Sequence, residues 1–188
     1  EAMGLPGQAK ATHVLPAKFP VVYLLHGFAN NHAQWTGYTN VELYAEERRI
    51  AIVNISAENK AYAKVGADDF KRFISEELPE FVENYFPVSD KSEERYIAGL
   101  SMGGFHSAQI SKEYPEMFDY VGLFSAAVFR GDNSSSPIYA NFEQKLKTQF
   151  DNAPKLYWIA IGKTDFLYEE NVRYRELLDS NGYEYTYV

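Results

Sequence analysis

The sequence predicts an α/β fold with a mostly parallel central sheet and helices on both of its faces. Short apolar runs without alternation recur along the chain, which is typical of strands buried on both sides. Segments with helical apolar spacing separate these runs, and strands that alternate with helices form right-handed βαβ units. The chain has 188 residues, a length that favours one domain over two.

Each predicted element follows from its own pattern. The expected strands, which are short, apolar and β-branched or aromatic, cover residues 20–26, 50–56, 95–100, 120–125 and 156–162, and the segment 183–188 is also strand-like. The expected helices cover residues 68–86, 102–114, 142–150 and 168–180. Pro79 predicts a kink or a break in the first helix. Gly182 follows the last helix at the position where helices usually stop.

The first residues of the chain have a different pattern from the rest. Residues 2–5 and 9–15 flank a Pro-Gly turn, so we expect an antiparallel hairpin at one edge of the sheet. The polar stretch Gly131 to Pro137 is too short to separate domains, and we interpret it as a surface loop. In such sheets the active site lies at the carboxyl ends of the strands.

Composition excludes several classes of function. The formal net charge is −8, which argues against a nucleic-acid partner. The absence of cysteine excludes disulfides, thiolate metal sites and a cysteine nucleophile. No apolar run is long enough to span a bilayer, and the oligomeric state is left open. The compartment is not determined by these features, although a secreted or periplasmic location is favoured over a cytoplasmic one.

One motif carries nucleophile chemistry. Residues 99–103 read Gly-Leu-Ser-Met-Gly, which matches G-x-S-x-G between a predicted strand and a predicted helix. A sharp turn with Ser101 at its apex needs glycine on both sides, because side chains there would collide with the neighbouring backbone. The Ser101 hydroxyl would then project above the sheet. The Met102 N–H would lie at the helix N-terminus, where an oxyanion is stabilised. The alternative is a glycine-rich turn that only packs the helix on the sheet.

Two further loops are expected to complete the site. The strand 20–26 ends in His26-Gly27-Phe28, which resembles an oxyanion loop, so the Phe28 N–H is the second candidate donor. We expect His26 to hydrogen-bond within that loop rather than to react. Asp165 follows the strand 156–161 and could orient a catalytic histidine. Its alternative role is to cap the next helix.

With these residues placed, the chain resembles the esterase D family of α/β-hydrolases. This family includes tributyrin-type acyl esterases, feruloyl and acetyl xylan esterases of carbohydrate esterase family one, and S-formylglutathione hydrolases. The matching stretches are FPVVYLLHGFANNHAQW (19–35), ISEELPEFVENYFP (74–87), RYIAGLSMGGFHSAQISKEYPEMFDYVGLFSAA (95–127) and IGKTDFLYEENVRYRELL (161–178).

The resemblance implies a serine esterase with the α/β-hydrolase fold. Ser101 would be the nucleophile, Asp165 the acid, and the N–H groups of Phe28 and Met102 the oxyanion donors. Trp35 would belong to a packed loop near the site, where it either packs in the core or contacts substrate. No metal or cofactor is needed. The expected substrates are short acyl, acetyl or feruloyl esters of carbohydrates, with S-formylglutathione or a siderophore trilactone as alternatives.

The catalytic histidine is the main departure from this family. In the family it follows the acid, yet all four histidines of this chain, His13, His26, His32 and His106, precede Asp165. We therefore expect residues 1–188 to be a single domain that lacks a C-terminal segment with the catalytic histidine and a last helix. Two joins also look short, near residues 16–17 and within 57–66. A catalytically silent binding protein with this fold is the alternative of another class.

Overall fold

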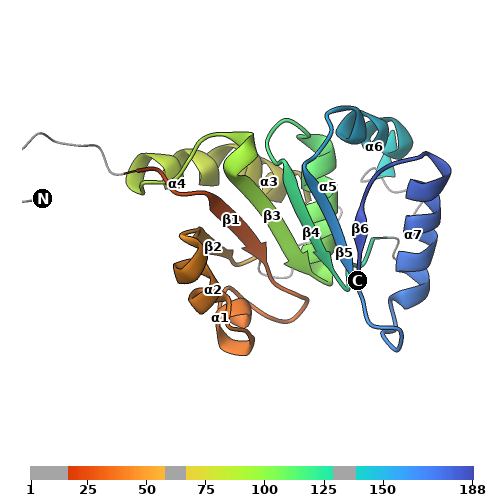
Figure 1. The fold of residues 1–188 in the computed structure, drawn as a ribbon, viewed down its shortest axis with the longest axis horizontal. Helices are drawn as coiled ribbons and strands as arrows, with labels where there is room; N and C mark the ends of the chain where they lie inside the picture. Colours follow the sequence, from red (N-terminus) through yellow and green to blue (C-terminus); the bar gives the residue numbers. More distant parts are fainter. Residues whose placement is uncertain (1–16, 58–66, 129–138) are drawn as a thin grey trace, which may run out of the picture.

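A computed structural model describes residues 17–57, 67–128 and 139–188. Six parallel strands form one sheet in the order β2-β1-β3-β4-β5-β6 (Figure 1). The strands are β1 (Val21–Leu25), β2 (Ala51–Ile55), β3 (Arg95–Leu100), β4 (Tyr120–Phe124), β5 (Leu156–Ala160) and β6 (Thr186–Tyr187). All five predicted strands are present, and the strand-like C-terminal segment forms the short β6.

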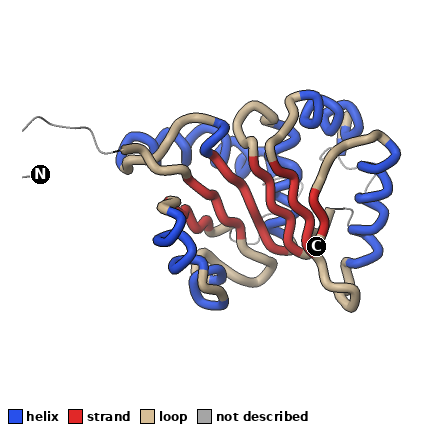
Figure 2. The backbone as a smooth tube through the Cα atoms, viewed as in Figure 1, coloured by secondary structure: helices blue, strands red, loops and turns tan. Residues whose placement is uncertain are grey.

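Helices occupy most of the segments between the strands (Figure 2). They are α1 (Gln34–Tyr38), α2 (Val41–Arg48), α3 (Ala67–Arg72), α4 (Leu78–Tyr85), α5 (Met102–Glu113), α6 (Phe142–Asp151) and α7 (Tyr168–Ser180), with a π-helical turn at Phe73–Glu77 and a 3-10 turn at Ser92–Glu94. The short helices α1 and α2 were not predicted. They bury no residue completely, so they lack the apolar stripe that identifies a packed helix.

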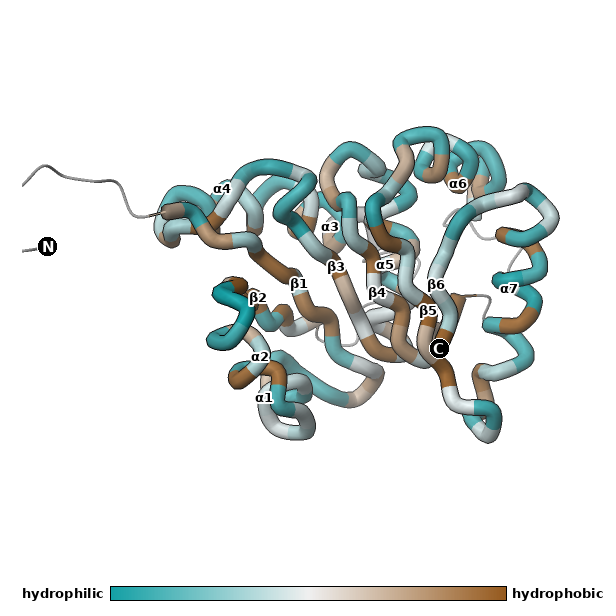
Figure 3. The backbone as a smooth tube through the Cα atoms, viewed as in Figure 1, coloured by the Kyte–Doolittle hydropathy of each residue, from teal (hydrophilic) through white to brown (hydrophobic). Residues whose placement is uncertain are grey.

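The core lies between the sheet and one layer of helices. Helix α5 packs across β1, β3 and β4 and lies behind the strands in Figure 1. The helices α4, α6 and α7 also contribute buried side chains to this core, for example Val82, Leu146 and Leu178. Figure 3 shows the corresponding pattern, in which brown, hydrophobic strands lie among helices with hydrophilic stretches.

The opposite face of the sheet is covered unequally. On this face, Trp35 of α1 packs edge-to-face on Phe124 of β4. Along β3, β4 and β5, however, every second residue is only half-buried in the described structure. Helices therefore lie on both faces, as predicted, but in the described residues the middle of this second face carries much less cover than the first.

The helix around Pro79 decides between the two predicted outcomes only in part. It is not broken there, because α3 passes through the π-helical turn directly into α4. A kink at this point stays a prediction. Proline has no N–H to donate to the preceding turn. The widened turn accommodates it, with the Leu78 N–H donating to the carbonyl of Phe73, five residues earlier.

The end of α7 agrees with its prediction. Gly182 has a φ of +70°, and the N–H groups of Gly182 and Tyr183 donate to the carbonyls of Asp179 and Leu178. This Schellman arrangement satisfies the last carbonyls of the helix and needs a residue that tolerates positive φ.

Some predictions fall outside the described residues. The N-terminal hairpin (2–5 and 9–15), the loop 131–137 and most of the two short joins (16–17 and 57–66) are among them. Among the described residues, no helix is both long and apolar enough to span a membrane.

Candidate active site

The turn between β3 and α5 has the geometry that the G-x-S-x-G motif predicts. Ser101 has φ 54° and ψ −110°, a strained conformation for a residue with a side chain. A Cβ on Gly99 would lie 2.2 Å from the carbonyl of Gly103. A Cβ on Gly103 would lie 2.3 Å from the carbonyl oxygen of Leu25. Both glycines are therefore required by close backbone approach, which places Ser101 at the tip of a rigid turn.

Three backbone hydrogen bonds of Ser101 hold this turn in place. The Ser101 N–H donates to the carbonyl of Phe124, and the Ser101 carbonyl accepts from the N–H groups of Phe105 and Ala127. Met102 is fully buried and begins α5. Its N–H belongs to the first turn, where backbone N–H groups have no partner within the helix. The helix dipole adds partial positive charge at the same place.

The loop after β1 lies against Ser101. A Cβ placed on Gly27 would be 3.7 Å from the Cβ of Ser101, so the Gly27 backbone runs directly beside the candidate nucleophile. The Gly27 N–H donates to Oε1 of Gln34 at 2.6 Å. This N–H is thus engaged. The next peptide, between Gly27 and Phe28, carries the N–H that the sequence predicts as the oxyanion donor of the loop.

His26 joins this loop to the end of β2. Its Nδ1 lies 2.7 Å from the Gly27 carbonyl oxygen, and its Nε2 accepts the N–H of Ala57 at 2.8 Å. The ring is buried, with 1% of its surface exposed. Both ring nitrogens are occupied, as expected for a structural histidine within the loop.

Asp165 lies in the loop after β5, at the same edge of the sheet as Ser101. One of its carboxylate oxygens, Oδ1, accepts the N–H of Leu167 at 2.9 Å. The other accepts no hydrogen bond from the described residues. The first residue of α7 is Tyr168 and its N-cap is Leu167, so Asp165 does not cap the helix itself. Leu167 belongs to a small buried cluster that also contains Phe105 of α5, which connects the Asp165 loop to the helix that follows Ser101.

The other histidines are placed away from a catalytic role or outside the described residues. His106 is 4% exposed and its ring contacts Phe70 in a tilted arrangement, with ring centroids 4.6 Å apart. Burial lowers its pKa to about 3, with a smaller contribution from neighbouring His26. His32 is exposed, and both its N–H and its Nδ1 contact Oγ of Ser56. His13 lies outside the described residues. Ser101 Oγ has no hydrogen bond to any described residue, these three rings included.

The Trp35 side chain packs against the sheet. Its indole Nε1–H donates to the carbonyl of Leu25 at 3.0 Å, and its ring contacts Phe124. The indole therefore braces the ends of β1 and β4, the two strands that flank β3.

Sequence reasoning missed two polar side chains that support these loops. Gln34 holds the Gly27 N–H, and Asn171 of α7 donates to the carbonyls of Ala126 and Leu167. Neither residue belongs to a motif, so only the fold reveals them. The exposure of two large rings was also not predicted, Phe28 at 61% and Phe166 at 87%. They lie on the two loops that carry the candidate oxyanion donor and acid.

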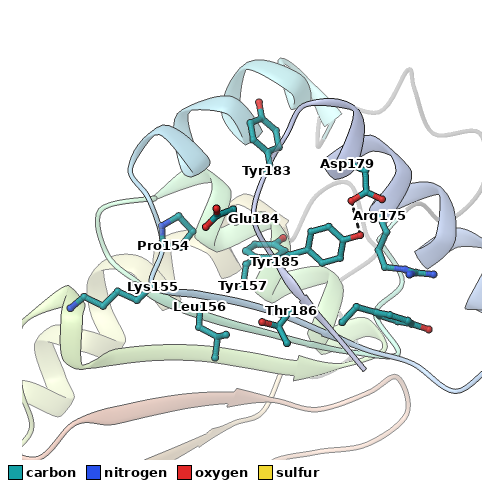
Figure 4. A pocket seen from close by; sticks show the side chains of 11 residues that line it. Pro154, Lys155, Leu156, Tyr157, Arg175, Asp179, Tyr183, Glu184, Tyr185 and Thr186 are labelled. Carbon is teal, nitrogen blue, oxygen red and sulfur yellow. Dashed lines mark hydrogen bonds between the residues drawn. The ribbon is translucent and has the colours of Figure 1, made fainter.

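A hollow of about 640 Å³ lies elsewhere, beside the start of β5, the end of α7 and β6 (Figure 4). Within it the Tyr185 hydroxyl donates to Asp179 at 2.9 Å. Ser101 and Asp165 follow the carboxyl ends of their strands, so this hollow belongs to the opposite end of the sheet. Among the described residues, no group of three or more histidines and carboxylates could hold a metal ion.

Comparison with known proteins gives the family. Residues 7–177 match the family model Esterase, described as "Putative esterase". The chain belongs to the esterase family. This esterase is 26% identical to the acetyl esterase of Caldicellulosiruptor saccharolyticus, over 88% of the chain and 73% of that protein. It is 28% identical to an endo-1,4-beta-xylanase/feruloyl esterase of Xylanibacter ruminicola, over 70% of the chain and 20% of that larger protein.

A solved structure confirms the fold of this esterase. Fluorophosphonate-binding serine hydrolase F of Staphylococcus aureus matches with a TM-score of 0.81 and 21% identity, over 94% of this chain and 77% of that one. The predicted α/β-hydrolase fold is thus confirmed, and the family assignment makes the chain an esterase.

Proposed function

We propose that this esterase hydrolyses carboxylic esters through an acyl-enzyme on Ser101. The observation that carries the proposal is the strained Ser101 turn, packed against the Gly27 backbone on one side and starting α5 on the other. Ser101 Oγ attacks the ester carbonyl and forms the new C–O bond. The N–H groups of Phe28 and Met102 stabilise the oxyanion, each contributing on the order of 3 kcal/mol. The alcohol leaves with the proton, and water then releases the acid and restores Ser101.

The general base in this proposal is a histidine outside the described residues. It takes the Ser101 proton, and the Oδ2 atom of Asp165 orients it and stabilises its charged form. The engaged ring of His26, the buried ring of His106 and the Ser56-bonded ring of His32 support this placement. The relatives are also longer, since the chain covers 73% of the acetyl esterase. We place the base in a segment beyond Val188.

We further propose that the substrates are acetyl, short acyl or feruloyl esters of carbohydrates. The acetyl esterase and the xylanase/feruloyl esterase among the relatives support this class. The exposed rings of Phe28 and Phe166 support it independently, because aromatic faces stack on sugars and aryl groups. Contact of Trp35 with substrate remains a prediction, since its indole is used in packing. S-formylglutathione and siderophore trilactones stay as alternative substrates.

Replacing the candidate nucleophile tests the proposed chemistry. In the full-length protein, we expect Ser101→Ala to lower kcat for p-nitrophenyl acetate by about 10⁶-fold, because no other group can form the acyl-enzyme. Ser180→Ala, an exposed serine at the end of α7, is the matched control and should keep full activity. Undiminished turnover in Ser101→Ala would refute the proposal.

Imidazole rescue tests where the base comes from. We expect the protein comprising residues 1–188 to hydrolyse p-nitrophenyl acetate weakly, and added imidazole to increase the rate only when Ser101 is present. The full-length protein should need no imidazole. Full activity of residues 1–188 without imidazole would contradict a base beyond Val188, and its loss in His13→Ala, His32→Ala or His106→Ala would identify the base within the chain.

A substrate panel tests the class of ester. We expect Phe166→Ala to raise KM for methyl ferulate several-fold and to leave KM for p-nitrophenyl acetate unchanged, because only the larger acyl group reaches an exposed ring on the Asp165 loop. The panel also contains acetylated xylan, S-formylglutathione and a trilactone. A kcat/KM that is highest for one of the last two substrates would replace the carbohydrate-ester proposal.

A further inference from the structure

The contacts of His26 determine which proton it carries. Ala57 presents a backbone N–H to Nε2, so Nε2 must accept. The neutral ring then carries its proton on Nδ1, which donates to the Gly27 carbonyl at 2.7 Å. The ring is 1% exposed, so water does not compete for either bond. His26, directly after β1, therefore holds the Gly27 carbonyl by a hydrogen bond from Nδ1.

The Gly27 carbonyl belongs to the peptide group that also contains the Phe28 N–H. The six atoms of a peptide group are coplanar, and in the trans form the C=O and N–H point in opposite directions. The described residues contain no cis peptide bond. A bond that pulls the Gly27 carbonyl toward His26 consequently aims the Phe28 N–H away from His26. The Gly27 backbone lies beside Ser101, with a Cβ position 3.7 Å from the serine Cβ.

The preceding peptide is fixed as well, by a different side chain. Oε1 of Gln34 accepts the Gly27 N–H at 2.6 Å. Gly27 thus has both of its backbone polar groups held by side chains, one from its own strand end and one from α1. Glycine has the widest conformational freedom of any residue, so these two bonds remove a freedom that would otherwise let the oxyanion loop rotate.

We propose that His26 is a positioning residue that aims the Phe28 N–H at the oxyanion through its bond to the Gly27 carbonyl. This inference rests on the proposed function, because it assumes that the Phe28 N–H stabilises the oxyanion formed on Ser101. It separates two roles within one ring. The Nδ1–H sets the direction of the donor peptide, and Nε2 only joins the loop to the end of β2.

Two substitutions of His26 separate these roles. In His26→Asn, the amide nitrogen can occupy the place of Nδ1 and donate to the Gly27 carbonyl, while the bond to Ala57 is lost. In His26→Gln, the longer side chain places an oxygen near the position of Nε2 and keeps the Ala57 bond, while the Gly27 bond is lost. If donor direction is what matters, asparagine rescues catalysis and glutamine does not.

The measured quantities are kcat, KM and the affinity of an arylboronic acid, which forms a tetrahedral adduct on serine. In the full-length protein we expect His26→Gln to lower kcat and boronate affinity on the order of 10- to 100-fold with KM unchanged, because only the charged oxyanion uses this donor. His26→Asn should stay within about 3-fold of the wild type, whatever its loss of thermal stability. His32→Asn and His32→Gln, which alter an exposed bond between the same two segments, should leave kcat unchanged.

Each outcome has a separate meaning. Equal kcat losses in His26→Asn and His26→Gln would overturn the positioning role, as would a loss that appears in KM rather than in kcat. Wild-type turnover in Ser101→Ala would instead remove the proposed function itself. Because the two His26 variants each keep one of the two bonds, unfolding of one of them still leaves the other to decide.

Discussion

His106 illustrates how a single buried side chain can couple the fold to pH. It lies on α5 with 4% of its surface exposed, and its Nε2 has no hydrogen-bond partner among the described residues. Burial lowers the pKa of this ring to about 3, whereas an unfolded histidine titrates near 6.5. The folded chain therefore keeps His106 neutral at pH values where the unfolded chain binds a proton.

This difference predicts a loss of stability in mild acid. Above pH 6.5 His106 is neutral in both states and adds no pH dependence. Below it the unfolded state gains a proton that the folded state does not, so stability falls by up to about 1.4 kcal/mol per pH unit until about pH 3. We expect the wild type to lose about 2 kcal/mol more than His106→Leu between pH 6.5 and 5, as measured by urea unfolding.

Replacing an exposed ring gives the control for that measurement. His32→Leu, in the loop after β1, should leave the pH dependence of the wild type in place. If His106→Leu and the wild type lose stability in parallel, the buried ring is not the source of the acid sensitivity.

At the same scale, the sequence predicted residues with a recognisable motif and missed those without one. Ser101, Gly99 and Gly103 have the predicted geometry because one tight turn imposes all three. Gln34 could not be predicted, because its contact with Gly27 depends on where α1 packs. The roles of Phe28, Met102 and Asp165 remain predictions.

Among the elements, α5 is the one whose position determines the site. Its first turn approaches two neighbouring segments so closely that it has no room for side chains. A Cβ on Gly104 would lie 2.5 Å from the Cβ of Ala126, in the segment after β4. The helix can therefore reach its position over β1, β3 and β4 only with glycines at its start.

A pair of glycine substitutions tests this close approach. We expect Gly104→Ala to destabilise the protein by about 1–3 kcal/mol, because the added methyl overpacks the contact with Ala126. In Gly37→Ala the methyl meets no atom within 4 Å, and it should be neutral or stabilise α1 by up to about 1 kcal/mol. Thermal unfolding of both variants measures the difference. Equal melting temperatures would contradict the close packing of α5.

The predictability of the elements depended on how much apolar surface each one buries. Helices α5, α6 and α7 carry buried residues and were predicted within a residue or so of their bounds. Helices α1 and α2 bury none completely and left no pattern to detect. The π-helical turn before Pro79 was missed because the sequence shows that a bond is lost there, but not how the backbone compensates.

For the molecule as a whole, the unequal cover of the sheet has energetic consequences. Ile159 and Trp158 are neighbours in β5 and point to opposite faces. Ile159 is fully buried against the helix layer, whereas Trp158 is only half-buried on the second face. The parallel direction of the strands followed from the sequence pattern, whereas their order in the sheet was not predicted. The uneven cover did not, because periodicity shows that a strand is apolar but not what packs on it.

We expect Ile159→Ala to cost about 3 kcal/mol of unfolding free energy, since it leaves a cavity in the core. Trp158→Ala should cost less, although it removes a larger side chain, because its ring already contacts solvent on one side. Urea unfolding of the full-length protein decides the comparison. A larger cost at Trp158 would contradict the uneven cover of the two faces.

The buried contact between Tyr157 of β5 and Tyr174 of α7 makes phenolate absorbance a measure of unfolding in alkali. The two hydroxyls lie 2.6 Å apart, and burial raises the pKa of both phenols. Surface tyrosines ionise first as the solution becomes alkaline, whereas this pair must stay neutral while the sheet and α7 remain together. In alkali, the last rise in phenolate absorbance should therefore coincide with separation of α7 from β5.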